Sequence, residues 1–143
     1  MPGYHWAVTS DAPAEQASLD RLPLPPDPAS AGAARRFVRE LLAKTGPYPD
    51  GLLDSALVVA SELVTNAVRH AAGAPLTIVV STAPEQLRIG VEDTSTELPA
   101  VVDPYEGGGR GMTVVEAMSS RWTVQRRPDG KVVWAVFDLP PTR

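Results

Sequence analysis

The longest run of regularly spaced apolar residues in the chain predicts a helix from Asp50 to about residue 72. Asp50 is a suitable N-cap for this helix, and Gly73 is a suitable stop. The apolar positions form one broad arc, which consists of Leu53, Ala56, Leu57, Ala60, Leu63, Val64, Ala67, Val68 and Ala71. We expect this arc to pack on a sheet, because an apolar helix face must be covered.

Two further segments show helical spacing. Asp27 and Pro28 supply an N-cap and a proline for the first helical position, so a helix is predicted from there to Gly46–Pro47. Its apolar positions are Ala34, Phe37, Val38, Leu41 and Leu42. A third and shorter helix is predicted within residues 112–121, where Val114, Val115 and Met118 recur at helical spacing.

The remaining patterns predict strands. Residues 18–24 are compatible with a short edge strand, the one place in a sheet where Pro23 is tolerated. Two runs rich in β-branched residues, 75–83 and 85–93, predict an antiparallel hairpin around Pro84–Glu85. Residues 122–127 and 131–139 predict a second hairpin across a Pro-Asp-Gly turn. Residues 1–17 lack a period and are expected to be a flexible lead-in, and residues 97–111 are expected to be a loop.

This order of elements predicts one domain over residues 18–143. Strands that follow one another through short turns pair antiparallel, and three helices must cover one face of the sheet. We therefore predict an α/β (α+β) two-layer sandwich with a mixed, mostly antiparallel sheet. A chain of 143 residues is long enough to bury a core of its own without metals or cross-links.

Charge and cysteine usage narrow the class of protein. The formal net charge is −4 and the isoelectric point is about 5.1, which argues against direct binding of nucleic acid. Cysteine is absent, so thiol chemistry and disulfides are excluded. Neither a basic leader nor a long apolar run occurs, and we expect a cytoplasmic protein with no membrane partner.

A polar stripe borders the apolar arc of the long helix. Glu62, Asn66 and Arg69 follow one another at positions i, i+4 and i+7. They are either solvated surface residues or a ligand site. Asn is a poor helix former in an interior turn, which favours a role for its side chain. A carboxylate and an amide oxygen on one helix face suit a proton acceptor and a ligand of Mg²⁺, which takes few protein ligands.

Two other segments are candidates for ligand binding. Residues 106–111 form a glycine-rich loop that runs into the third predicted helix, where backbone N–H groups can receive a phosphate. Asp93 ends a predicted strand, and its carboxylate can accept a hydrogen bond from an exocyclic amine such as that of adenine. A flexible surface loop and a strand-ending aspartate are the alternative interpretations of these two features.

In order, the stretches SELVTNAVRHA, VEDTSTELP and GGGRGMTVVEAMSSRWTV resemble the N, G1 and G2 boxes of the GHKL ATP-binding superfamily, which includes gyrase, MutL and histidine-kinase catalytic domains. They look most like the small bacterial anti-sigma-factor serine kinases. The resemblance covers about residues 18–140.

The resemblance implies a Bergerat fold that binds ATP and Mg²⁺. By its motifs, Asn66 would ligate Mg²⁺, Glu62 would act as general base and Asp93 would recognise the adenine amine. Gly109, Arg110 and Gly111 would close on the phosphates. Arg69, Ser95 and Met112 lie within the same three motifs and complete the expected ATP-binding set.

The chain departs from the family pattern at three positions. The G1 box usually reads Asp-x-Gly-x-Gly, whereas Ser95 and Glu97 stand here in place of the two glycines. Relatives often carry a threonine near the start of the last strand that helps to hold adenine, where this chain has Val132. On this basis Asp93 is expected to hold the base with water alone.

The function implied by the resemblance is that of an anti-sigma factor with ATP-dependent serine/threonine kinase activity. Its protein partners would be a sigma factor and an anti-sigma-factor antagonist, and relatives are often homodimers. The alternative is an ATP-responsive interaction module without phosphoryl transfer. An independent ATP hydrolase is disfavoured, because no additional water-positioning segment is apparent in so short a chain.

Overall fold

The computed structural model of the protein describes residues 6–9, 12–14, 16–70, 73–95 and 111–141. Three helices and six strands are present in this part of the chain. They follow one another as β1 (Trp6–Thr9), β2 (Ser18–Leu24), α1 (Ser30–Thr45), α2 (Leu52–His70), β3 (Leu76–Ala83), β4 (Gln86–Asp93), α3 (Gly111–Met118), β5 (Arg121–Arg127) and β6 (Gly130–Asp138).

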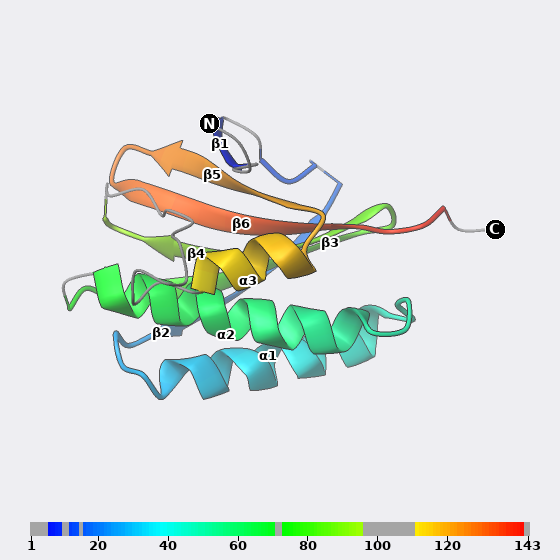
Figure 1. Ribbon diagram of the computed structural model, residues 1–143, viewed down its shortest axis with the longest axis horizontal. Coiled ribbons are helices and arrows are strands. Elements are labelled where there is room, and N and C mark those ends of the chain that lie inside the picture. The colour runs from blue at the N-terminus through cyan, green and yellow to red at the C-terminus, as the bar shows by residue number, and fades with distance from the viewer. Residues whose placement is uncertain (1–5, 10–11, 15, 71–72, 96–110, 142–143) are drawn as a thin grey trace.

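The strands form one sheet in the order β1-β5-β6-β4-β3-β2. Neighbouring strands pair antiparallel, with the exception of β1 and β5, which are parallel. The three helices lie on one face of this sheet, with α2 between α1 and α3 (Figure 1). The predicted two-layer sandwich with a mixed, mostly antiparallel sheet is therefore confirmed.

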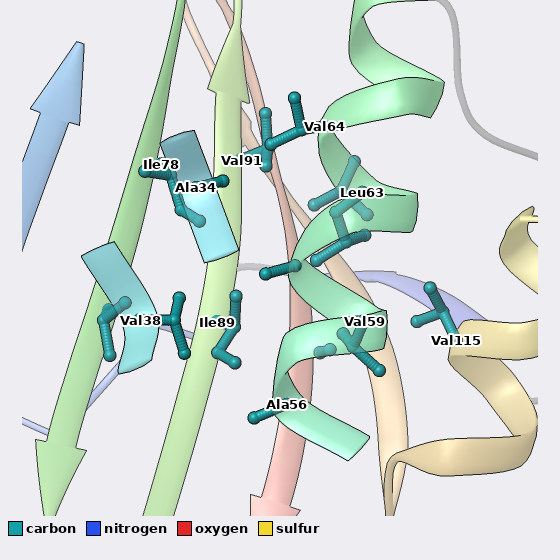
Figure 2. Close-up of a cluster of buried hydrophobic side chains, with 14 of the residues drawn as sticks. Ala34, Val38, Ala56, Val59, Leu63, Val64, Ile78, Ile89, Val91 and Val115 are labelled. Atoms are coloured by element: carbon teal, nitrogen blue, oxygen red, sulfur yellow. The ribbon is translucent and has the colours of Figure 1, made fainter. Parts of the chain in front are cut away.

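The main core lies between α2 and the centre of the sheet. Figure 2 shows side chains of α2 meeting those of β3 and β4, with α1 and α3 closing the two sides. The predicted apolar arc of α2 is largely correct over the described residues, which do not include Ala71. Leu53 is nevertheless 39% exposed, and Val59, which was not among the predicted members, is fully buried. Burial of Val59 follows from α3, because this third helix packs on a side of α2 that a single-face pattern does not anticipate.

A second and smaller apolar cluster lies on the opposite face of the sheet and consists of Val79, Val132 and Trp134. Side chains alternate along a strand, and Val133 and Ala135 belong to the helix-facing core, so Val132 and Trp134 point the other way. Val132 consequently lies on the face away from the helices.

The first strand corrects our interpretation of the N-terminal lead-in. We expected no regular structure before residue 18, yet Trp6–Thr9 pairs with β5 in the register Trp6↔Trp122 to Thr9↔Gln125. A four-residue strand carries no measurable period, and the partner that stabilises it lies near the other end of the sequence. The predicted strand at Ser18–Leu24 is confirmed at the opposite edge of the sheet.

Two helix starts also differ from prediction. α1 begins at Ser30, because Asp27 accepts a hydrogen bond from the Ala29 N–H (2.8 Å) and closes a turn before the helix. α2 begins at Leu52, because Gly51 has φ +84° and cannot be the first helical residue after Asp50. Both predicted hairpins are confirmed within one residue, and the third helix is confirmed but ends at Met118, three residues before the end of the predicted range.

Of the helices that the structure describes, none combines the length and hydrophobicity needed to cross a lipid bilayer. The predicted loop at residues 97–111 lies outside the described residues except for Gly111, which begins α3.

Candidate functional site

Four chain segments meet at one end of the molecule. α2 and β4 both end there, α3 begins there, and the turn between β5 and β6 lies beside them (Figure 1). Figure 2 shows that α2 and β4 run in the same direction, since Val64 lies level with Val91 while Ala56 lies lower, near Ile89. The helix stripe and the end of β4 are therefore on the same side of the fold.

The polar stripe of α2 borders the core as predicted. Glu62 and Asn66 are half-buried, whereas Arg69 is exposed in the last turn of the helix. Ser61, next to Glu62, accepts a hydrogen bond from the Arg35 guanidinium of α1 (2.8 Å), which helps to fix the rotation of α2. Glu62 and Asn66 thus face a partly dry region that remains accessible to a ligand.

Glu62 lies against the first residue of α3. A Cβ atom placed on Gly111 would lie 2.9 Å from the Glu62 Oε2 atom. Cβ atoms in proteins essentially never come this close to another heavy atom. Glycine at position 111 therefore lets this carboxylate and the start of α3 approach one another without displacing the end of the Glu62 side chain. The structure brings together the carboxylate of the first motif and the helix start of the third.

Asp93 is the last residue of β4 and is 6% exposed. Its Oδ1 atom accepts hydrogen bonds from the Ser95 N–H (2.8 Å) and from the Lys131 ammonium (2.9 Å). Ser95 contributes through its backbone, so this turn is closed by Asp93 although serine replaces the usual glycine. We expected water alone to assist Asp93, and the structure instead places a lysine beside it.

Lys131 is the site residue that sequence analysis missed. It is the second residue of β6 and the cross-strand partner of Asp93, and the side chains of this ion pair are only 5% and 3% exposed. Its ammonium also donates to the Ser95 carbonyl oxygen (3.2 Å). The feature that could have identified Lys131 is the register of β4 against β6, which pairs it with Asp93. Without that register, a lysine between a turn and an apolar strand looks like a surface residue.

The turn before Lys131 is held tightly against β4. Gly130 has φ +153°, and a Cβ atom on it would overlap the Asp93 carbonyl oxygen and approach the Thr94 Cα atom to 2.7 Å. Only glycine allows this backbone contact, which fixes Lys131 in register beside Asp93.

A pocket of about 500 Å³ opens at this end of the sheet, and both members of the ion pair line it. Its lining consists of Pro23, Pro75, Leu76, Thr77, Glu92, Asp93, Thr94, Arg127, Pro128, Asp129, Gly130 and Lys131. This volume is within the range of about 300–1,000 Å³ that is usual for small-molecule sites. Glu62 and Asn66 are not among the residues that line it.

The other predicted site residues have different outcomes. Met112 is 1% exposed and belongs to the apolar core, so its side chain is not directed at a ligand. Gly109 and Arg110 lie outside the described residues, and their predicted contact with phosphates stays a prediction.

Comparison with known proteins gives an independent view of the same residues. Residues 24–137 match the family model of the histidine kinase-like ATPase domain. No curated protein matches the chain.

Among the solved structures that resemble the fold are two that differ in what they contain. One contains the RsbU and RsbW domains of Rv1364c from Mycobacterium tuberculosis, with a TM-score of 0.60 and 23% identity over 88% of this chain. The other is the histidine kinase domain of the blue-light activated histidine kinase EL346 from Erythrobacter litoralis, with a TM-score of 0.51 and 22% identity over 81% of this chain. The chain spans 34% and 62% of these two proteins, respectively.

Proposed function

The chain belongs to the family of histidine kinase-like ATPase domains, and from this we propose that it binds Mg-ATP and acts as an anti-sigma factor with serine/threonine kinase activity toward an anti-sigma-factor antagonist. Family membership supports the ATP-binding part of this proposal. The resemblance of the three sequence motifs to anti-sigma-factor serine kinases supports the regulatory part.

The described residues fit an adenine nucleotide with Mg²⁺. The Asp93 carboxylate, which lines the pocket at the end of the sheet, offers an acceptor for the exocyclic amine of the base. The side chain of Asn66 supplies the amide oxygen that a hard cation takes, and the cation fills its remaining positions with phosphate and water. Gly111 begins a helix whose N–H groups can receive a phosphate.

Glu62 would then act as the general base. Mg-ATP supplies the phosphoryl group and the charge compensation when it is bound. Glu62 accepts the proton of a serine hydroxyl from the partner protein, which raises the nucleophilicity of that oxygen. Half-burial suits this role, because a partly desolvated carboxylate is held in place while it stays accessible to a substrate.

The single observation that carries this proposal is the close approach of the Glu62 carboxylate to Gly111. The Glu62 carboxylate lies beside a helix start, where an anion is most favourably received, and this supports its role as the proton acceptor. A protein that only bound nucleotide would not need a carboxylate at that position, since it would repel the phosphates.

Incubation with labelled ATP and candidate antagonist domains tests the kinase activity. We expect label on a serine of one antagonist, and we expect Glu62→Gln to retain nucleotide binding while its transfer rate falls by a factor of about 10² to 10⁴. Glu40→Gln, on the exposed face of α1, is the matched control and should transfer normally.

Transfer by Glu62→Gln at the parental rate would remove Glu62 from the mechanism. Tight binding of ATP without transfer to any antagonist would instead identify an ATP-responsive interaction module.

A further inference from the structure

The buried ion pair at the end of the sheet has a chemistry that the three motifs do not account for. We propose that Lys131 is a base-specificity residue that, together with Asp93, allows 6-oxopurine nucleotides such as GTP and ITP to bind as well as ATP. This inference rests on the proposed function, because it concerns the base-binding end of the same nucleotide site.

The acceptor for a bound base is the Oδ2 atom of Asp93. Both hydrogen bonds that described residues donate to the Asp93 side chain fall on its Oδ1 atom, and the Oδ2 atom receives none of them. A carboxylate oxygen can accept two hydrogen bonds, so Oδ2 is the acceptor that a bound base would use. The contacts on Oδ1 keep the carboxylate plane fixed, which prepares Oδ2 for this role.

The donor to a bound base is the ammonium group of Lys131. An ammonium group carries three N–H donors, and the described residues take two of those of Lys131, at Asp93 Oδ1 and at the Ser95 carbonyl oxygen. The third N–H is available to a ligand. Because Asp93 and Lys131 are cross-strand partners and line the same pocket, this donor lies beside the acceptor.

A hydrogen-bond donor beside an acceptor matches the base-pairing edge of adenine and also that of the 6-oxopurines. Adenine presents the N6 amine as donor and N1 as acceptor, so N6 meets Asp93 and N1 meets Lys131. Guanine and hypoxanthine present N1–H as donor and O6 as acceptor, so N1 meets Asp93 and O6 meets Lys131. A carboxylate alone would repel O6 and favour adenine, and the lysine removes that repulsion.

Burial makes this pair decisive for recognition. The two side chains are 3% and 5% exposed, and a hydrogen bond to a charged group in such an environment is stronger than one at the surface. A base that left the third N–H of Lys131 without a partner would lose affinity for the same reason.

Calorimetric titration of the full chain with Mg-ATP, Mg-GTP and Mg-ITP tests the inference. We expect the dissociation constants for GTP and ITP to lie within about tenfold of that for ATP. Magnesium tripolyphosphate is included to measure the part of the affinity that does not depend on a base.

Variants of Lys131 identify the responsible group. In Lys131→Met the ratio of the dissociation constant for GTP to that for ATP should rise at least about tenfold, because O6 then faces a carboxylate without a donor. Lys131→Arg retains a charged donor and should keep the parental ratio. Lys44→Met changes the only other lysine of the sequence, which is exposed on α1, and should leave all three constants unchanged.

The outcomes separate this inference from the proposed function. If the parent binds ATP but discriminates against GTP and ITP by more than about a hundredfold, or if Lys131→Met leaves the ratio unchanged, Lys131 does not set base specificity. If the parent binds none of the three nucleotides, the proposed function itself is wrong. The parental ratio decides the matter even where Lys131→Met does not fold.

Discussion

Gly90 carries no side chain, and the indole ring of Trp134 lies where one would be. A Cβ atom on Gly90 would come 2.5 Å from the Trp134 Cε3 atom and 2.8 Å from Cζ3. The ring can therefore lie flat on β4, where its Nε1–H donates to the Gln125 side chain (2.9 Å). One glycine thus permits the largest residue of the cluster on the face away from the helices.

Replacement of Gly90 should be costly. Gly90→Ala forces the buried indole to move, and we expect a loss of about 1–3 kcal/mol in the free energy of unfolding. Gly32→Ala is the matched control, because a Cβ atom there would meet only arginine side chains at 3.5 Å and 3.6 Å and alanine favours the helix. Urea denaturation of both variants measures the difference, and equal midpoints would show that Trp134 does not depend on Gly90.

The ion pairs Asp93–Lys131 and Asp138–Arg121 differ in burial. The loss in the free energy of unfolding when each pair is broken should therefore differ too. Asp93→Ala leaves the buried Lys131 charge without its carboxylate, which should cost about 3–5 kcal/mol. Asp138→Ala breaks a pair whose side chains are 57% and 41% exposed, which should cost no more than about 1 kcal/mol. Denaturant unfolding of both variants tests this, and similar losses would mean that the Asp93 pair is effectively solvated.

At the scale of the element, α2 is bounded by two glycines with left-handed backbone. Gly51 has φ +84° before the helix and Gly73 has φ +83° after it, and a Cβ atom on either would meet nothing within 4 Å. Substitutions there act through the backbone alone. The position of α2 matters because it carries Glu62 and Asn66.

The start of α2 can be tested separately from its packing. Gly51→Ala should lower the free energy of unfolding by about 1–2 kcal/mol, since alanine is strained at this φ. Gly51→Asn should lose less, because asparagine tolerates the left-handed region. Thermal unfolding measures both, and an alanine variant as stable as the parent would contradict the assigned conformation of residue 51.

At the scale of the whole molecule, the fold was predictable wherever the signal was local. The apolar period of α2 and the turn residues of both hairpins identified the elements that make up most of the core. The pairing of β1 with β5 was not predictable, because a short strand takes its stability from a distant partner. The same limit applies to the site, where Glu62 and Asn66 followed from helix spacing and Lys131 required the register of β4 and β6.

The ends of α2 and β4 gather with the start of α3 at one end of the molecule, and we propose that the three motifs there act as one nucleotide site. Titration calorimetry of Mg-ATP into Asn66→Ala tests this most directly, with Thr65→Ala, an exposed neighbour on the same helix, as control. Saturable binding by the parent and by Thr65→Ala, with binding lost in a folded Asn66→Ala, is the predicted result. Binding of Mg-ATP by Asn66→Ala with the parental affinity would contradict the assignment of α2 to the nucleotide site.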